Sequence, residues 1–207
     1  MRKSLLIFDF DGTIADTLVV AEQVLNETGR EFGLPRISRQ QLMEFKHKSI
    51  PELLKLSGLS WIQLPSFVKK LRSRFKSHAK QVNPIQGMPE ILSTLKTRGY
   101  RMEILTSNAQ EVVQCFLQDH DLSVFEFVHA PDSIFGKSKA LKNILKRRKL
   151  SASQVVMIGD ELRDVEAAQK VGMESIAVTW GFNSEQLLRK GGANHIVTKP
   201  DHLLQLL

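Results

Sequence analysis

Two aspartates stand two residues apart at the end of an apolar stretch near the start of the chain. Asp9 and Asp11 belong to the segment LLIFDFDG, residues 5–12, whose first four residues are typical of a buried β-strand. Residues i and i+2 of a strand point to the same side, so both carboxylates are expected to share one small volume. At roughly 5 Å and an effective dielectric constant of about 20, their repulsion is about 3 kcal/mol. A divalent cation or a shared proton offsets such repulsion, and either one indicates chemistry.

Polar residues also follow three later apolar stretches of the strand type. They are Thr106, Ser107 and Asn108 after residues 101–105, Gly136 and Lys137 after residues 125–129, and Gly159, Asp160 and Glu161 after residues 154–158. In an open parallel sheet, ligands bind outside the carboxyl ends of the strands. We therefore expect these residues and the two N-terminal aspartates to converge on one pocket.

Each of these groups also has a purely structural interpretation. Aspartate and glycine are common in turns, Asp160 or Glu161 can cap the helix that follows, and residues 106–108 can cap a helix at 109–119. Capping and catalysis are compatible, because hydroxyl and free N–H groups at a helix N-terminus also bind phosphate. Together with Asp9, Asp160 supplies the second carboxylate that Mg²⁺ prefers. Asp164, one helical turn later, can orient a bound water or a lysine.

The elements that must position these side chains alternate between strands and helices. Strands are predicted at residues 5–8, 101–105, 125–129, 154–158, 175–178 and 195–197, and amphipathic helices between them include 89–98, 109–119, 138–148 and 163–171. This alternation predicts an α/β fold in which a parallel sheet is covered by helices on both faces.

One interval breaks the alternation. Residues 17–83 contain no strand pattern and are helical throughout, and Pro84, Gly87 and Pro89 mark the return to the sheet pattern. We therefore expect two domains, a core formed by residues 1–16 and 84–207 and an inserted helical domain formed by residues 17–83.

Composition limits the classes of protein to consider. The chain has 207 residues, of which 42% are hydrophobic, and no apolar run approaches the ~20 residues that span a bilayer. We expect a globular, cytoplasmic protein without a membrane partner. Cys115 is the only cysteine, which excludes an internal disulfide and a cysteine-based zinc site. The net charge of +7 permits an anionic partner, although the basic helix faces at residues 69–80 and 142–149 lie opposite apolar stripes, as in ordinary solvated helices.

In order and spacing, the segments DFDGTIADT, ILTSN, FGKSKAL and MIGDELRD resemble the haloacid dehalogenase superfamily of phosphatases, and most closely its phosphoglycolate phosphatase-like branch. The resemblance covers nearly the whole chain. It implies a Rossmann-like, doubly wound core with a helical cap inserted after the first strand. It also implies Mg²⁺-dependent phosphoryl transfer through an aspartyl-phosphate.

The resemblance gives each motif residue a role. Asp9 matches the nucleophile, and Asp11 matches the general acid and base. The magnesium ligands match Asp9, the backbone carbonyl of Asp11, and Asp160, with Glu161 and Asp164 beside them. The residues that match the phosphate-binding group are Thr106, Ser107, Asn108 and Lys137.

Lys139 stays an alternative to Lys137, because Ser138 stands where many relatives have a proline. The spacing to Asp160 favours Lys137.

The sequence thus predicts a phosphatase of a small phosphorylated metabolite. A phosphomutase of the same superfamily stays open, and so does a nucleic-acid-associated protein or terminal-phosphate phosphatase that uses the basic helices. In the inserted domain, Lys46, His47 and Lys48 are candidates for contact with an anionic part of the substrate.

Overall fold

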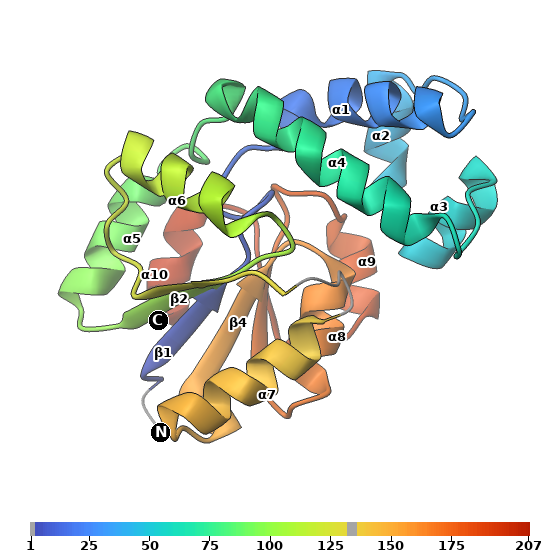
Figure 1. Ribbon diagram of the computed structural model, residues 1–207. Coiled ribbons are helices and arrows are strands. Elements are labelled where there is room, and N and C mark those ends of the chain that lie inside the picture. The colour runs from blue at the N-terminus through green and yellow to red at the C-terminus, as the bar shows by residue number, and fades with distance from the viewer. Residues whose placement is uncertain (1–2, 132–135) are drawn as a thin grey trace.

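The centre of the protein is a parallel β-sheet of six strands. The structure is a computed structural model that describes residues 3–131 and 136–207. The strand order is β3-β2-β1-β4-β5-β6 (Figure 1). The strands are β1 (Leu5–Phe8), β2 (Arg101–Leu105), β3 (Phe127–His129), β4 (Val155–Gly159), β5 (Glu174–Val178) and β6 (His195–Val197). This topology confirms the predicted α/β class.

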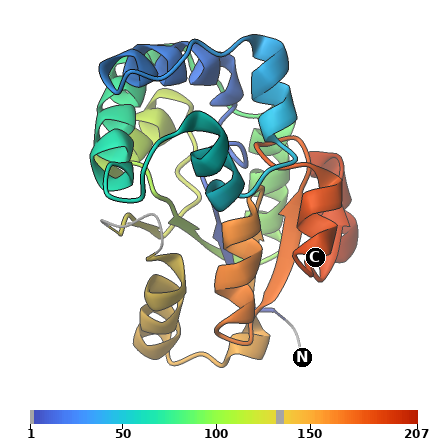
Figure 2. The same cartoon turned by 90° about the vertical axis from the view of Figure 1, so that its right-hand side faces the viewer.

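Helices cover both faces of the sheet (Figures 1 and 2). The helices cover both faces because the side chains of the central strand are apolar on both faces: every residue of β1 is apolar and buried. Leu6 and Phe8 pack in the hydrophobic cluster that includes residues of α5, α6 and α10, whereas Leu5 and Ile7 pack in the cluster that includes residues of α7 and α8. The helices of the core are α5 (Met88–Thr97), α6 (Gln110–Asp119), α7 (Lys137–Arg148), α8 (Leu162–Gln169), α9 (Glu185–Lys190) and α10 (Leu203–Leu206), with the short 3₁₀ turns η2 (Ala152–Gln154) and η3 (Pro200–His202).

A second group of helices lies over the carboxyl ends of the strands (Figures 1 and 2). It consists of α1 (Leu18–Glu31), α2 (Arg39–Phe45), α3 (Ile50–Ser57), α4 (Leu64–His78) and η1 (Ala79–Gln81). Its two connections to the sheet run antiparallel beside each other. Asp16 N–H donates to the Asn83 carbonyl at 2.9 Å, and Ile85 N–H donates to the Ile14 carbonyl at 2.8 Å. The helical segment therefore leaves and re-enters the core at one place.

The predicted strands all occur; three have the predicted bounds, and the bounds of β3, β4 and β5 differ by one or two residues. The third strand begins at Phe127 instead of residue 125. Lys137 is the first residue of α7, with Gly136 as its N-cap, so this lysine lies on a helix and not in the preceding loop. The difference matters because a helix fixes the direction of its side chain more firmly than a loop does.

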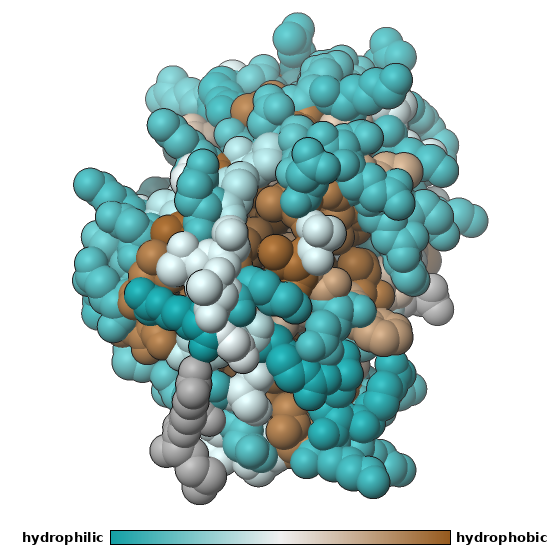
Figure 3. All heavy atoms as spheres, turned by 90° about the vertical axis from the view of Figure 1, so that its left-hand side faces the viewer, coloured by the Kyte–Doolittle hydropathy of each residue, from teal (hydrophilic) through white to brown (hydrophobic). Residues whose placement is uncertain are grey.

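No helix of the described residues is long and apolar enough to cross a membrane. Figure 3 shows the side of the molecule on which α5 and α6 lie, where hydrophobic side chains gather near the centre of a largely hydrophilic surface. A hollow of about 530 Å³ between α6 and β3 is lined by residues that include Leu117, Leu122, Phe125 and Phe127. It contains none of the predicted site residues.

Candidate active site

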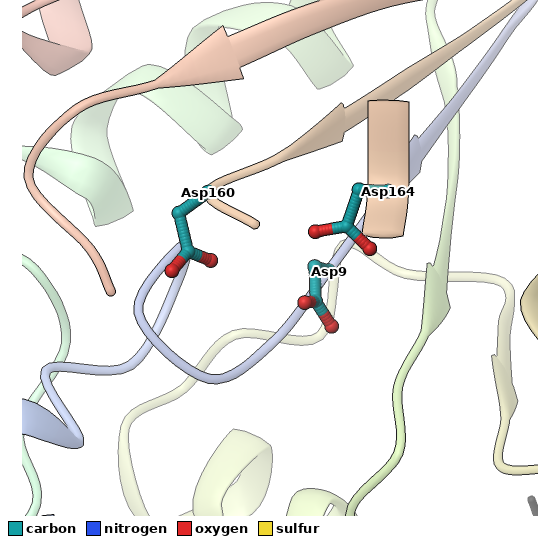
Figure 4. Close-up of side chains that lie close together, drawn as sticks. All are labelled: Asp9, Asp160 and Asp164. Atoms are coloured by element: carbon teal, nitrogen blue, oxygen red, sulfur yellow. The ribbon is translucent and has the colours of Figure 1, made fainter. Parts of the chain in front are cut away.

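Three aspartates lie together beyond the carboxyl end of the sheet (Figure 4). Asp9 follows β1, Asp160 follows β4, and Asp164 lies in the first turn of α8. All three are buried, and one carboxylate oxygen of each lies within 4.8 Å of those of the other two. Buried like charges at such distances repel one another strongly. The cluster therefore needs positive charge, either from the chain or from a bound cation.

The sheet itself holds Asp9 in place. Its backbone N–H donates to the Ile158 carbonyl at 2.7 Å, which extends the pairing of β1 with β4 by one residue. Asp9 Oδ1 accepts the backbone N–H of Phe10 at 2.8 Å. Among the described residues, no group donates a well-aligned hydrogen bond to Oδ2, which lies 2.7 Å from Lys137 Nζ in a charge contact. Asp9 thus keeps an oxygen with an uncommitted lone pair inside the site.

The carboxylate of Asp160 is enclosed by two short loops. Thr13 Oγ1 donates to Asp160 Oδ1 at 2.7 Å, and Phe182 N–H donates to Oδ2 at 2.7 Å. A Cβ atom at Gly12 would lie 2.5 Å from Oδ2, and one at Gly181 would lie 2.1 Å from it. Gly12 also has a φ of +74°, whereas Gly181 is outside the left-handed region. The absence of side chains at both positions lets the loops close on the carboxylate.

Lys137 places an ammonium group in direct contact with the cluster. Its side chain is 3% exposed, and Nζ lies 2.7 Å from Asp9 Oδ2 and donates to Asp164 Oδ1 at 2.5 Å. Burial acts to lower the pKa of Lys137, but the charges of Asp164 and Asp9 outweigh it and raise the pKa above its ordinary value. Lys139 is exposed. The structure therefore places Lys137, and not Lys139, in the site.

Further charged groups lie at the start of α8. Asp164 Oδ2 accepts the N–H of Glu161 at 3.1 Å, as in a capping box, so Asp164 is held at both of its oxygens. Arg163 Nε donates to Glu161 Oε2, and its Nη2 donates to Ser107 Oγ at 3.2 Å. Arg163 thereby ties the start of α8 to the loop that follows β2.

The loop after β2 brings hydroxyl, amide and N–H groups to the same place. Thr106 N–H donates to the His129 carbonyl at 2.9 Å, which extends the pairing of β2 with β3, and the Thr106 hydroxyl accepts the N–H of Asn108 at 2.9 Å. Asn108 Nδ2 donates to Asp11 Oδ1 at 3.2 Å. Asp11 is therefore oriented by the loop, and its carboxylate lies outside the cluster of three aspartates.

Negative charge exceeds positive charge in the site. Burial raises the pKa of Asp11 to about 7, with the charge of Asp9 acting in the same direction. The pKa of Asp164 is also raised to about 7, by burial and by Asp9, against the opposing effect of Lys137. Burial and the charges of Glu161 and Asp9 raise the pKa of Asp160 well above its ordinary value. Within the part of the core that the structure describes, the interacting charges are the carboxylates of Asp9, Asp11, Asp160, Glu161 and Asp164 and the cations of Lys137 and Arg163.

These residues fit a hard divalent cation. Carboxylate oxygens are the donors that such ions prefer, Asp9 Oδ2 lacks a well-aligned donor, and the excess negative charge is offset when a cation binds. Each carboxylate oxygen of Asp160 accepts one hydrogen bond, which leaves a lone pair on each that can bind a metal ion.

The nine residues to which the resemblance gives a role in the core lie at this edge of the sheet. They are Asp9, Asp11, Thr106, Ser107, Asn108, Lys137, Asp160, Glu161 and Asp164. Asp164, expected beside the metal ligands, lies within the carboxylate cluster itself.

Sequence reasoning missed Thr13, Arg163 and the loop that contains Gly181 and Phe182. Thr13 and Arg163 stand inside the recognised segments, so a signal existed for them. Phe182 contributes only its backbone N–H, which no residue type reveals.

Comparisons with known proteins show the family to which the chain belongs. The family model described as haloacid dehalogenase-like hydrolase matches residues 6–178. The chain is 32% identical over 201 residues to a phosphoglycolate phosphatase from Synechococcus elongatus, covering 97% of this chain and 95% of that protein. It is 27% identical over 218 residues to a 5′-nucleotidase from Pseudomonas aeruginosa, covering 100% of this chain and 96% of that protein.

The fold has solved counterparts as well. The crystal structure of a predicted phosphatase from Clostridium acetobutylicum superposes with a TM-score of 0.85 at 22% identity, covering 100% of this chain and 98% of that one. The family model matches most of the chain, and the sequence likeness to the cyanobacterial phosphatase extends over nearly all of it. This chain therefore belongs to the haloacid dehalogenase-like hydrolases, close to the phosphoglycolate phosphatases, and is a phosphatase.

Proposed function

We propose that the protein is a Mg²⁺-dependent phosphatase that hydrolyses a small, phosphoglycolate-like phosphomonoester through an aspartyl-phosphate on Asp9. One observation carries the proposal. Asp9 Oδ2 has no well-aligned hydrogen-bond donor among the described residues, yet it is buried within a carboxylate cluster and beside the ammonium of Lys137. A carboxylate oxygen has two lone pairs, so an oxygen that only a charge contact engages can attack an electrophile.

Asp9, the backbone carbonyl of Asp11, and Asp160 are the groups that would hold Mg²⁺. When bound, the ion supplies positive charge that offsets the negative charge of the aspartates and of the transferring phosphoryl group. Asp164 already accepts hydrogen bonds from Lys137 and from Glu161 N–H, so its role is to orient these groups.

The phosphoryl group is transferred in two steps. In the first step, a carboxylate oxygen of Asp9 bonds to phosphorus, the ester P–O bond breaks, and Asp11 gives its proton to the leaving oxygen. In the second step, water attacks phosphorus, Asp11 accepts a proton from the water, and the bond to Asp9 breaks. The pKa of about 7 at Asp11 makes both protonation states available near neutral pH.

The loop after β2 and the start of α7 bind the transferring phosphate. The hydroxyl of Thr106, the N–H of Ser107 and the ammonium of Lys137 supply hydrogen-bond donors and charge at the phosphoryl oxygens. Asn108 acts through Asp11, whose carboxylate it holds at 3.2 Å.

We propose further that residues 17–83 form a cap domain over a core of residues 1–16 and 84–207, and that the cap selects the leaving group. The helices of this segment lie over the site, and both connections to the core lie side by side. The substrate class follows the relative from Synechococcus elongatus, which is a phosphoglycolate phosphatase. A metabolite of this kind and a single cysteine favour a cytoplasmic location.

The nucleic-acid alternative is weaker. On α4, Lys70 and Arg74 form ion pairs with Glu31 of α1, and Arg74 also pairs with Glu27 at 3.2 Å, so part of the basic face is neutralised within the protein. Nucleic-acid binding predicts an affinity that falls steeply with salt, with a log–log slope of about −0.9 per neutralised phosphate on duplex DNA. Binding that is weak and insensitive to salt removes this alternative.

The proposal is tested by screening the purified protein against a panel of phosphorylated metabolites, with Mg²⁺ and with EDTA. We expect Mg²⁺-dependent release of inorganic phosphate from one or a few small esters, and its loss in Asp9→Asn. Formation of an isomeric sugar phosphate in place of free phosphate identifies a phosphomutase. Full activity of Asp9→Asn refutes the proposal.

A further inference from the structure

Lys46 of the helical segment lies beside the loop that encloses Asp160. Lys46, the C-cap of α2, is half-buried, and its backbone carbonyl accepts the N–H of Ser184 at 2.8 Å. Ser184 ends the loop whose Phe182 N–H binds Asp160. The Phe182 side chain packs against the hydrophobic cluster formed by Leu18, Ala21 and Leu42. The backbone of Lys46 is therefore anchored to the loop that encloses Asp160.

The charge environment of Lys46 is unusual for a partly buried cation. Within residues 3–131 and 136–207, no carboxylate lies within ion-pair distance of its ammonium. Burial lowers the pKa of Lys46 below its ordinary value, the charge of Asp160 acts in the opposite direction, and the charge of Arg39 lowers the pKa further. A partly desolvated ammonium without a partner costs free energy, which a bound anion recovers.

The two neighbours of Lys46 do not share this environment. His47 is exposed. The charge of Lys48 acts on Glu52, in the first turn of α3, where Ser49 also donates to the Glu52 carboxylate. Lys48 therefore provides a matched control, with the same charge two residues away and a different carboxylate beside it.

We propose that Lys46 sets the specificity of the enzyme by binding a second anionic group on the leaving-group side of the substrate, a carboxylate or a second phosphate. The inference rests on the proposed phosphatase function and adds the residue that distinguishes a negatively charged leaving group from an uncharged one. A cation from the helical segment and the carboxylates of the core then face the two ends of one small substrate, and this arrangement also favours closure of the segment over it.

The test compares phosphoglycolate with 2-hydroxyethyl phosphate, in which a hydroxymethyl group replaces the carboxylate. Hydrogen bonds to charged groups contribute enough that Lys46→Met is expected to raise KM for phosphoglycolate by about 10- to 100-fold. The same variant should leave kcat/KM for 2-hydroxyethyl phosphate within about twofold of the wild-type value. Lys48→Met should leave the kinetic constants for both substrates unchanged. Lys46→Arg should restore part of the preference for phosphoglycolate over 2-hydroxyethyl phosphate. Pyrophosphate, a phosphoanhydride, replaces phosphoglycolate to report whether the second anion is a phosphate. A Lys46-dependent preference for phosphoglycolate or for pyrophosphate over 2-hydroxyethyl phosphate supports the inference.

Two results are kept apart by this design. If the wild-type protein hydrolyses substrates with charged and with uncharged leaving groups, and Lys46→Met affects all of them equally or not at all, the role of Lys46 is refuted and the phosphatase function stands. If the wild-type protein hydrolyses no phosphomonoester in a manner that requires Mg²⁺ and Asp9, the proposed function fails, and the inference fails with it.

Discussion

Gly181→Ala tests whether the position of the Asp160 carboxylate controls the activity. The added Cβ would lie 2.1 Å from Asp160 Oδ2 and 2.3 Å from Cγ, well inside van der Waals contact. The backbone at Gly181 is not in the left-handed region, so alanine is not disfavoured by its own conformation. The carboxylate or the loop must therefore move by roughly 1 Å, a displacement that can cost about 100-fold in rate at an active site.

We expect kcat/KM of Gly181→Ala to fall by about 100-fold, and the Mg²⁺ concentration for half-maximal activity to rise. Overpacking of this kind also destabilises a protein by about 1–3 kcal/mol, which corresponds to a fall in Tm of about 2–12 °C for a chain of this size. Gly29→Ala is the matched control, because a Cβ there meets Leu34 Cβ at an ordinary 3.4 Å and lies on α1, away from the site.

The measurements are steady-state kinetics across a Mg²⁺ titration, with circular dichroism to confirm that both variants are folded. A folded Gly181→Ala protein with the kcat/KM and Mg²⁺ dependence of the wild type would show that Asp160 does not need its observed position. The reasoning from loop packing to metal binding would then be wrong.

Three further predictions concern charge in the site. Lys137→Met leaves the buried carboxylates of Asp9 and Asp164 without their cation, so the free energy of unfolding should fall by about 3–5 kcal/mol and kcat by at least about 100-fold. The control Lys139→Met should change neither quantity, as measured by thermal unfolding and steady-state kinetics. Mg²⁺ at about 100 times its Kd should stabilise the protein by about 2.7 kcal/mol and raise Tm by about 5–10 °C, and Asp160→Asn should remove most of that shift. A carboxyl whose pKa is raised in the folded state stabilises the fold at low pH, and this contribution is lost as the pH rises through the folded-state pKa. Because the pKa of Asp11 is about 7, the Tm of the metal-free protein should fall between about pH 4 and 8. Asp11→Asn should remove part of this fall in Tm.

The sheet and the motif side chains were predictable because their signals are local. A continuous apolar run such as Leu5–Phe8 indicates a strand buried on both faces, and a polar residue directly after it must lie at the sheet edge. The position of Asp164 beside Asp9 follows from one helical turn after Asp160. The burial of Lys137 could be predicted only if the first residue of α7 was known. The sequence predicted that this helix begins at residue 138, one residue later than in the structure.

Features that depend on distant partners were not predictable. Glu103 lies inside the predicted strand 101–105 and is fully buried, because His129 Nε2 on β3 contacts it at 2.6 Å and Arg148 at the end of α7 donates to it at 2.5 Å. Nothing within the strand indicates either partner. The contact between Lys46 and Ser184 likewise joins two segments far apart in the chain through backbone atoms alone, which carry no signature of residue type.

The central claim is that Asp9 becomes phosphorylated during turnover, and chemical trapping tests it most directly. The Mg²⁺-loaded protein is mixed with its best substrate, quenched with acid within the first turnover, and digested for mass spectrometry. We predict one phosphorylated peptide, the one that contains Asp9, with a modification that hydroxylamine removes and that Asp9→Asn lacks. Rapid hydrolysis without any phosphorylated peptide in the wild type, or with phosphate on a different residue, would contradict the account.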